Sequence, residues 1–380
     1  MIYICYLCLF IGASFLDFTK GQTELKKVTL CFLVVISIFF VGLRYYTGAD
    51  WSGHLNYFNT VIWQDNRYAI GYKALNLLCR AIVDDYHLVQ FVASSFFIIS
   101  VARFFYKYSK YPFLCLFILV ALYFRNLFMA LVRQDLAVAV LLWGSGYIFE
   151  RRFWSWCMIV LIASSFHVTA IVCLLFPLLN IHLTRKMRFL FCLVPFIIYF
   201  LPDLLFSFVE LMTKIPGTLG VLTMRYLNSE RFSKGVELSS GIVFFSKMIF
   251  SILILLLSKD IVKKKDDSTN FFLNGLLISV ILNSLTLVFR IFSRLEIYVC
   301  CYAIIGFVHF FRIGIIKKEK SFFFPILFLF ILYFTLPFAK NMLVSKIDPV
   351  TLRDVQYQYI PYYNVFFHPE NANQRKDWNQ

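Results

Sequence analysis

The decapeptide Gly42-Leu43-Arg44-Tyr45-Tyr46-Thr47-Gly48-Ala49-Asp50-Trp51 ends the second apolar segment of the chain. It follows an apolar run over residues 34–43 and places an arginine, a carboxylate and three aromatic side chains where that run stops. Charge at the end of an apolar segment is costly in a bilayer unless the protein uses it. We therefore expect this stretch to lie at one edge of a membrane, with Arg44 and Asp50 as candidate functional groups.

The composition excludes a soluble globule. Of 380 residues, 60% are hydrophobic and only 15% are charged, and the mean hydropathy is +0.74. Apolar segments recur along nearly the whole chain, each near the ~20 residues that a helix needs to cross a bilayer. We predict an all-α, polytopic membrane protein with one transmembrane domain over residues 1–340. Residues 1–18 lack a basic start and a clear cleavage site, so they are expected to form the first span.

The net charge of +16 fits cytoplasmic loops better than a nucleic-acid surface, because the cations lie in short segments between spans. Two spans between neighbouring basic clusters and one at each end predict about 12 spans, within a range of about 10 to 13. The outer side then carries the loops 44–87 and 213–240 and an aromatic tail, 341–380. The six clusters are Lys20/Lys26/Lys27, Arg103/Lys107/Lys110, Arg151/Arg152, Arg185/Lys186/Arg188, Lys259/Lys263/Lys264/Lys265 and Arg312/Lys317/Lys318/Lys320.

Two regions are tight for this count. Residues 112–149 must hold two spans joined near residues 125–133. Residues 153–181 number only 29, so they form either two short spans or a re-entrant hairpin with its tip near Ser164-Ser165-Phe166-His167. One long tilted helix is disfavoured because it would place the basic residues after position 181 outside.

The first outer loop contains a helical pattern over residues 73–84. Its apolar side chains share one face, whereas Lys73, Asn76, Arg80 and Asp84 share the other. This pattern predicts an amphipathic helix lying on the outer membrane surface. The loop 213–240 is equally well read as a flexible lid or as a plain connector.

Two further positions are candidates for chemistry. Arg133 lies near or inside the membrane with Asp135 two residues on, so it faces a polar cavity or closes the end of its span beside an acid. His167 lies in an apolar run, where a histidine is either hydrogen-bonded packing or a catalytic group. For Arg44, a grip on phosphate or carboxylate competes with simple snorkelling to the interface.

Near the end of a later span, Arg290 and Arg294 lie four residues apart, and Tyr298 follows on the same helical face. Two adjacent guanidiniums repel each other unless an anion or an acid lies between them. An external anion such as pyrophosphate is therefore expected there. The aromatic segment 357–367 is read either as an interfacial anchor or as a sugar-stacking surface.

Most of the ten cysteines lie in apolar runs without zinc spacing, which indicates small core residues. No acidic metal cluster is evident either. We therefore expect neither a metal nor a cofactor.

In order along the chain, several short motifs resemble the EpsG-like, Wzy-type polymerases of O-antigen, capsule and exopolysaccharide assembly. This resemblance implies a multi-pass glycosyltransferase of the bacterial cytoplasmic (inner) membrane that acts on its outer face without a metal. It would transfer a growing glycan from undecaprenyl pyrophosphate to the non-reducing sugar of another lipid-linked repeat unit, as in lipopolysaccharide synthesis. The motifs are Gly42-Leu43-Arg44 to Asp50, Tyr57, Gly71-Tyr72 with Leu75-Asn76, Arg133-Gln134 with Leu136-Ala137, Ala163 to His167 with Thr169-Ala170, Arg294 with Tyr298, and Pro361-Tyr362.

With this resemblance, roles can be assigned as expectations. The lipid pyrophosphate would be bound by Arg44, Arg133, Arg290 and Arg294, with Tyr298 beside them. Asp50 or His167 would take the acceptor proton, with Asp50 preferred. The helix carrying Lys73 and Arg80 would shape the entrance for the lipid. The partners would be an undecaprenyl-pyrophosphate-linked oligosaccharide and membrane lipid, with a chain-length regulator left open and nucleic acid excluded.

Three alternatives remain at this point. An O-antigen ligase uses the same donor but should have a larger outer domain than the loop 44–87. A sugar acyltransferase would suit His167 but not outer arginines that bind pyrophosphate. A lipid-glycan flippase or transporter should show internal repeats or charge along a path through the bundle.

Overall fold

The computed structural model describes residues 2–201, 207, 210–211, 214, 267–286, 289, 291–315, 331–336, 338–340, 342 and 359–368. Apart from Lys214, the loop 213–240 lies outside the described residues, and so does Arg290. The described part is helical, and its one β-type pairing is an isolated antiparallel bridge between Arg44 and Asn364. The chain divides into two compact units, residues 1–174 with 319–380 and residues 175–318.

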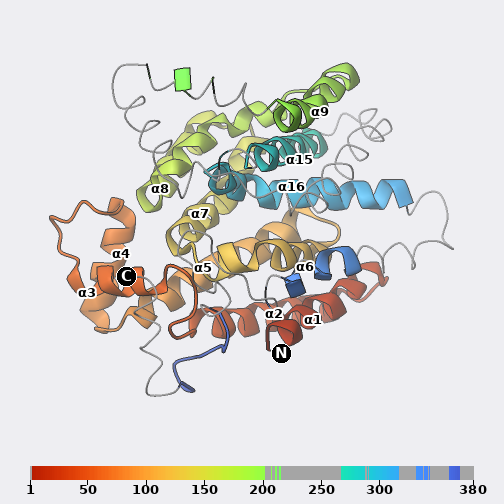
Figure 1. The fold of residues 1–380 in the computed structure, drawn as a ribbon. Helices are drawn as coiled ribbons and strands as arrows, with labels where there is room; N and C mark the ends of the chain where they lie inside the picture. The colour runs from red at the N-terminus through yellow and green to blue at the C-terminus, as the bar shows by residue number, and fades with distance from the viewer. Residues whose placement is uncertain are drawn as a thin grey trace. The chain divides into compact units, whose positions relative to one another are not determined.

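From α1 to α9, within residues 2–200, the helices follow one another with short connections (Figure 1). The first unit contains α1 (Ile2–Ser14), η1 (Phe15–Phe18), α2 (Thr23–Gly42), α3 (Trp51–Thr60), α4 (Ile70–Ile82), α5 (Tyr86–Tyr108), α6 (Pro112–Tyr123), the π-helical turn η2 (Phe124–Phe128), α7 (Val132–Phe149) and α8 (Phe153–Phe166). The 3-10 segment η3 (Val168–Asn180) leads to the second unit, which contains α9 (Arg185–Phe200), α15 (Asp267–Leu285) and α16 (Phe292–Ile315).

Four described helices are long and apolar enough to cross a bilayer. They are α2, α5, residues Ser268–Leu285 of α15 and residues Phe292–His309 of α16. Shorter apolar helices, including α6 and α8, accompany them. This all-helical, apolar build agrees with the predicted membrane protein, while the count of about twelve spans stays a prediction.

Arg44 lies at one end of the first unit. The buried side chain of Gln90, near the start of α5, donates from Nε2 to the carbonyl oxygens of Gly42 and Arg44 at 2.7 and 2.9 Å. The end of α2 therefore lies beside the start of α5. Gly48 is in the left-handed region (φ +114°), and a Cβ there would overlap the carbonyl oxygen of Met129, so the α6–α7 connection is at this end too.

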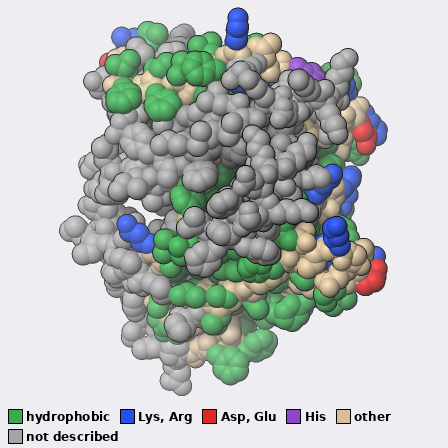
Figure 2. All heavy atoms as spheres, turned by 90° about the vertical axis from the view of Figure 1, so that its right-hand side faces the viewer, with side chains coloured by type: hydrophobic (Ala, Val, Ile, Leu, Met, Phe, Trp, Pro, Cys, Tyr) green, Lys and Arg blue, Asp and Glu red, His purple; other side chains and the backbone are tan. Residues whose placement is uncertain are grey.

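The basic clusters of the first unit lie at the opposite end. The carboxylate of Asp17 accepts a 2.8 Å hydrogen bond from the backbone N–H of Leu114 at the start of α6. A Cβ on Gly146 of α7 would lie near Lys107 of α5. The basic clusters of the first unit therefore lie at one end of its helices, which is the distribution that the positive-inside rule describes. On the face shown in Figure 2, lysine and arginine side chains lie among apolar ones and acidic side chains are few.

The two regions that are short for their predicted spans, residues 112–149 and 153–181, both contain the predicted break between two segments. The spans of residues 112–149 meet at a connection between η2 and α7, within the predicted region 125–133. In the second region, α8 ends at Phe166 and His167 is extended (φ −147°, ψ 111°), which rules out one continuous helix. Trp156 Nε1 donates to the carbonyl oxygen of Cys173 at 2.9 Å, so the two arms of a hairpin lie side by side.

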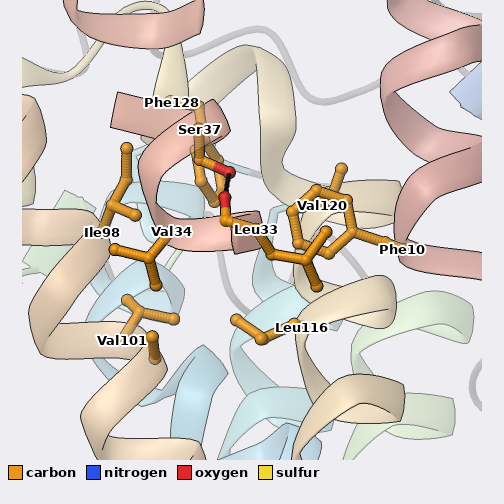
Figure 3. Close-up of a pocket in the computed structure, with 10 residues that line it drawn as sticks. Phe10, Leu33, Val34, Ser37, Ile98, Val101, Leu116, Val120 and Phe128 are labelled. Carbon is orange, nitrogen blue, oxygen red and sulfur yellow. Dashed lines mark hydrogen bonds between the residues drawn. The ribbon is translucent and has the colours of Figure 1, made fainter. Parts of the chain in front are cut away.

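A small apolar cavity lies among α1, α2, α5 and α6 (Figure 3). Its volume of about 20 Å³ would hold about one water molecule. Ser37 is its polar lining residue, and the Ser37 hydroxyl donates to the carbonyl oxygen of Leu33 at 2.6 Å while accepting from Tyr6 at 2.7 Å. Because Ser37 is satisfied, the cavity offers no group for chemistry.

Candidate active site

Arg44 is 1% exposed, and its guanidinium binds its own chain. Nη1 donates to the carbonyl oxygen of Val41 at 2.6 Å, and Nε donates to that of Thr47 at 3.2 Å. A side chain that snorkels to the interface would extend into water instead. Arg44 therefore holds the turn after α2 together and places a positive charge inside the protein.

The C-terminal segment 359–368 lies along this turn, where Figure 1 shows it in dark blue beside the end of α2. Tyr45 N–H donates to the carbonyl oxygen of Tyr363 at 2.9 Å, and Val365 N–H donates to that of Leu43 at 3.0 Å. The hydroxyl of Tyr3 donates to the carbonyl oxygen of Tyr359, which is buried. This part of the aromatic tail packs on protein, while its outward position and any sugar stacking stay predictions.

Helix α3 presents its buried face at a three-to-four-residue spacing, with Trp51, His54, Tyr57 and Phe58 turned inward. Trp51 Nε1 donates to Oε1 of Gln90 at 2.7 Å, which anchors the start of this helix to α5. Ten residues are too few to cross a bilayer, so α3 belongs to the loop between α2 and α5, whose position on the outer side stays a prediction.

His54 is the functional candidate that the sequence did not reveal. It is 3% exposed, and Nδ1 is 2.9 Å from the hydroxyl oxygen of Tyr72. Burial, followed by the positive charges of Arg133 and Arg44, lowers the pKa of His54 from 6.5 to about 3. The ring is therefore neutral at pH 7, lying within electrostatic reach of two arginines.

Arg133 is the second residue of α7, so it lies at the end of that helix and not at mid-span. Its guanidinium carbon is 3.8 Å from the centre of the Tyr68 ring, a close cation–π contact. Among the residues that the structure describes, neither a hydrogen-bond acceptor nor an acid pairs with this half-buried guanidinium. The stacked group keeps its N–H donors available for an anion.

Asp135 interacts with the other arginine. It is 6% exposed, and Arg44 is the charge that acts on it. Its Oδ1 atom has no donor in the described part of the chain. The alternative in which an acid pairs with Arg133 is therefore not what this helix shows.

Asp50 directly precedes α3 and is half-buried, and its carboxylate does not cap the helix. His167 occupies the tip of the α8–η3 hairpin, where Nδ1 is 2.7 Å from the hydroxyl oxygen of Thr169. Its neighbour Phe166 packs against the aromatic cluster that contains Tyr57 and Tyr72. Both proposed bases thus adjoin the same cluster, Asp50 through Trp51 and His167 through Phe166.

Helix α4 was predicted over residues 73–84 and runs from Ile70 to Ile82. Its polar side faces the protein. Lys73 Nζ donates to two carbonyl oxygens of the α3–α4 connection at 2.8 Å each, while Arg80 donates to the carbonyl oxygens of Phe58 and Val61 at 3.1 and 2.8 Å. Arg80 therefore holds the end of α3, and Lys73 holds the connection that follows it.

The apolar side of α4 is turned outward. Leu78 is 65% exposed and Ile82 is 77% exposed. The neighbouring Trp63 is exposed as well. An exposed apolar face is what an interfacial helix requires, so the contact with lipid stays a consistent prediction.

Arg294 and Tyr298 belong to the second unit, one helical turn apart near the start of α16. Arg294 is half-buried and Tyr298 is buried. Glu296, between them, is buried and accepts a 2.8 Å hydrogen bond from Ser279 of α15. The convergence of Arg294 with the arginines of the first unit stays a prediction.

The comparisons with known proteins agree with the resemblance seen in the motifs. The family model for the EpsG family matches residues 27–364, which include every candidate residue named above. No curated protein and no solved structure matches the chain. Because the matched region covers most of the chain, this protein is a member of the EpsG family, a family of polysaccharide-polymerase-type membrane proteins.

Proposed function

We propose that the protein polymerises lipid-linked glycan repeat units on the outer face of the bacterial cytoplasmic membrane. The observation that carries this proposal is Arg133, whose guanidinium is stacked on Tyr68 and has no acceptor among the described residues. A planar guanidinium held in one orientation is suited to bind phosphate oxygens with paired hydrogen bonds. The anion that a polymerase of this kind must bind is the pyrophosphate of its lipid carrier.

In the proposed reaction, a hydroxyl oxygen on the non-reducing sugar of one unit attacks the anomeric carbon of the growing chain. A new glycosidic C–O bond forms as the C–O bond to the pyrophosphate breaks. Undecaprenyl pyrophosphate leaves with the bonding electron pair, and the hydroxyl proton passes to a base. Arg133 stabilises the charge that develops on the leaving pyrophosphate.

Asp50 is the first candidate for that base and His167 is the second. Asp50 is half-buried beside Trp51, so its carboxylate can reach a ligand bound next to the aromatic cluster. Arg44 has a different part in this scheme. Two of its five N–H donors bind backbone carbonyl oxygens and its side chain is 1% exposed, so in this scheme Arg44 adds positive potential next to the pyrophosphate site from inside the protein.

The outward face of α4 is proposed to border the entrance for the lipid carrier. Arg80 supports that entrance by fixing the end of α3, and Lys73 supports it by fixing the α3–α4 connection, since both cations donate to carbonyl oxygens there. The remaining partners are those expected for the reaction, a lipid-linked oligosaccharide and the surrounding membrane lipid.

The test of the reaction is glycan size in a strain that lacks the gene and carries variants on a plasmid. Loss of the long ladder, with one repeat unit left on the lipid core, supports a polymerase. Loss of every repeat unit would instead assign the protein to ligation or to flipping. An unchanged ladder would refute an involvement in chain growth altogether.

The same strain tests Arg133. We expect Arg133→Gln to shorten the ladder strongly, by a rate loss on the order of 10²-fold, because one stabilising donor group is removed. Arg133→Lys should keep part of the activity, since the charge remains without the planar fork. Arg103→Gln is the matched control, because Arg103 is stacked in the same way on Trp143, at 4.0 Å, at the end with the basic clusters. Full-length polymer from Arg133→Gln at normal protein levels would refute the role.

One substitution at each position distinguishes the two candidate bases. Asp50→Asn keeps the size of the side chain, His167→Asn keeps a polar amide near the position of Nδ1, and both remove a proton acceptor. We expect Asp50→Asn to abolish elongation and His167→Asn to reduce it only partly. The reverse ranking, at equal protein levels, would transfer the role of base to His167.

A further inference from the structure

Arg125 is a further arginine at the end of the first unit that carries Arg44 and Arg133, and neither the sequence motifs nor the proposed reaction has used it. It lies in the π-helical turn η2, between α6 and α7, and is half-buried. Its guanidinium carbon is 4.8 Å from the centre of the Tyr359 ring. Within the described residues, no acceptor or acid pairs with it, as is also true of Arg133.

The residues around Arg125 are held in place by hydrogen bonds and burial. The carbonyl oxygen of Asn126 accepts hydrogen bonds from the backbone N–H groups of Ala130 and Leu131 at 3.2 and 2.9 Å, which fixes the turn. Tyr359 is 4% exposed, and Tyr3 holds its carbonyl group. π-Helical turns occur often at functional sites, where they displace one side chain from the regular helical position.

The two stacked arginines are served by different parts of the chain. Arg133 stacks on Tyr68, in the connection before α4, and its positive charge contributes to the lowered pKa of His54. Arg125 stacks on Tyr359, in the C-terminal segment, and Tyr359 interacts electrostatically with Arg44. They therefore form two separate cation sites at the same end of the first unit, with Arg44 as a shared electrostatic neighbour.

We propose that Arg125, held flat on the Tyr359 ring, binds the phosphate of a second lipid-linked molecule. This inference rests on the proposed polymerase function, in which two lipid-linked units meet in each turnover. Arg133 then binds the pyrophosphate of the donor, and Arg125 binds that of the acceptor. The same guanidinium chemistry would also bind the phosphate of a phospholipid headgroup, and the experiment must distinguish these two sources.

The experiment counts bound lipids on the full-length protein in phosphatidylcholine nanodiscs by native mass spectrometry. Undecaprenyl pyrophosphate is titrated in one arm and phosphatidylglycerol in the other. Wild-type protein should bind two molecules of undecaprenyl pyrophosphate, and Arg125→Gln and Arg133→Gln should each bind one. The control Arg103→Gln should bind two. Phosphatidylglycerol binding should be the same for wild type and Arg125→Gln.

Two milder variants keep the test valid if Arg125→Gln fails to fold. Arg125→Lys retains the charge without the fork, and Tyr359→Leu removes the ring that orients the guanidinium. Each should weaken the second binding event by about tenfold, the effect of one lost charge-assisted hydrogen bond. Tyr359→Phe keeps the ring and should leave both binding events unchanged.

The outcomes separate this inference from the function on which it rests. Arg125→Gln retaining two bound pyrophosphates overturns the second site, even if Arg133→Gln loses one. A loss confined to phosphatidylglycerol assigns Arg125 to headgroups and overturns the acceptor role. If wild-type protein binds undecaprenyl pyrophosphate no better than Arg133→Gln does, the proposed function itself fails.

Discussion

The pH dependence of stability is the sharpest consequence of the buried His54. The pKa of this ring is about 3 in the folded protein, because burial and then the charges of Arg133 and Arg44 disfavour the imidazolium. The unfolded chain has the ordinary value near 6.5. As the pH falls below 6.5, His54 therefore binds a proton in the unfolded state but stays neutral in the folded state. The free energy of unfolding must fall over this range.

The size of the effect follows from the difference between the two pKa values. At pH 5 the imidazole of the folded protein is still neutral. In the unfolded chain the imidazole is protonated, because pH 5 is about 1.5 pH units below its pKa of 6.5. At ~1.4 kcal/mol per unit, His54 alone should lower the free energy of unfolding by about 2 kcal/mol between pH 8 and pH 5. Near pH 3 the folded ring begins to titrate, and the loss levels off.

The assay is equilibrium unfolding in mixed micelles at a series of pH values, comparing wild type with His54→Asn. Asparagine places an amide near the position of Nδ1 and can keep the contact with the Tyr72 hydroxyl, but it does not titrate. Carboxylates contribute equally to both proteins, so the difference between the two curves isolates the histidine. A wild-type curve that runs parallel to the His54→Asn curve from pH 8 to pH 5 would show that His54 is not held neutral.

Three further predictions concern the framework around the site. Gly48→Ala should destabilise the protein by several kcal/mol, roughly the cost of strain at a left-handed residue plus a steric overlap, whereas Gly53→Ala should be neutral or stabilising because nothing lies within 4 Å. Thermal unfolding of the purified pair decides this. Gln90→Leu should cost about 3 kcal/mol, since three hydrogen bonds of about 1 kcal/mol each are lost, and the unfolding midpoint should show it. Arg80→Met keeps the aliphatic stem but frees two carbonyl groups, so amide exchange at the end of α3 should quicken while α5 stays protected.

The features predicted correctly from the sequence are those that depend on local patterns. The join between α6 and α7, the hairpin tip at residues 164–167 and the helix around Lys73 follow from charge, hydropathy and helical period. His54 was missed because its burial depends on α3 packing against α4 and α5. The docking of Asn364 on Arg44 pairs residues at opposite ends of the chain, and no local signal specifies such a contact.

The sequence also could not separate the two kinds of arginine at the end of the first unit where α2 stops and α7 begins. Arg44 and Arg133 both border apolar runs and both have a carboxylate nearby, so the same patterns predict the same role. The difference is one of hydrogen bonding. Arg44 is buried and donates two hydrogen bonds to the carbonyl oxygens of Val41 and Thr47, whereas Arg133 is stacked on a ring and has no acceptor among the described residues.

His54 connects these two arginines, and its state limits how the site can respond to substrate. An anion on Arg133 would cancel one of the charges that lower the pKa of His54. Burial is the larger cause and would remain, so the ring stays neutral through turnover at neutral pH. A pH dependence of polymer synthesis near neutrality must therefore come from another group.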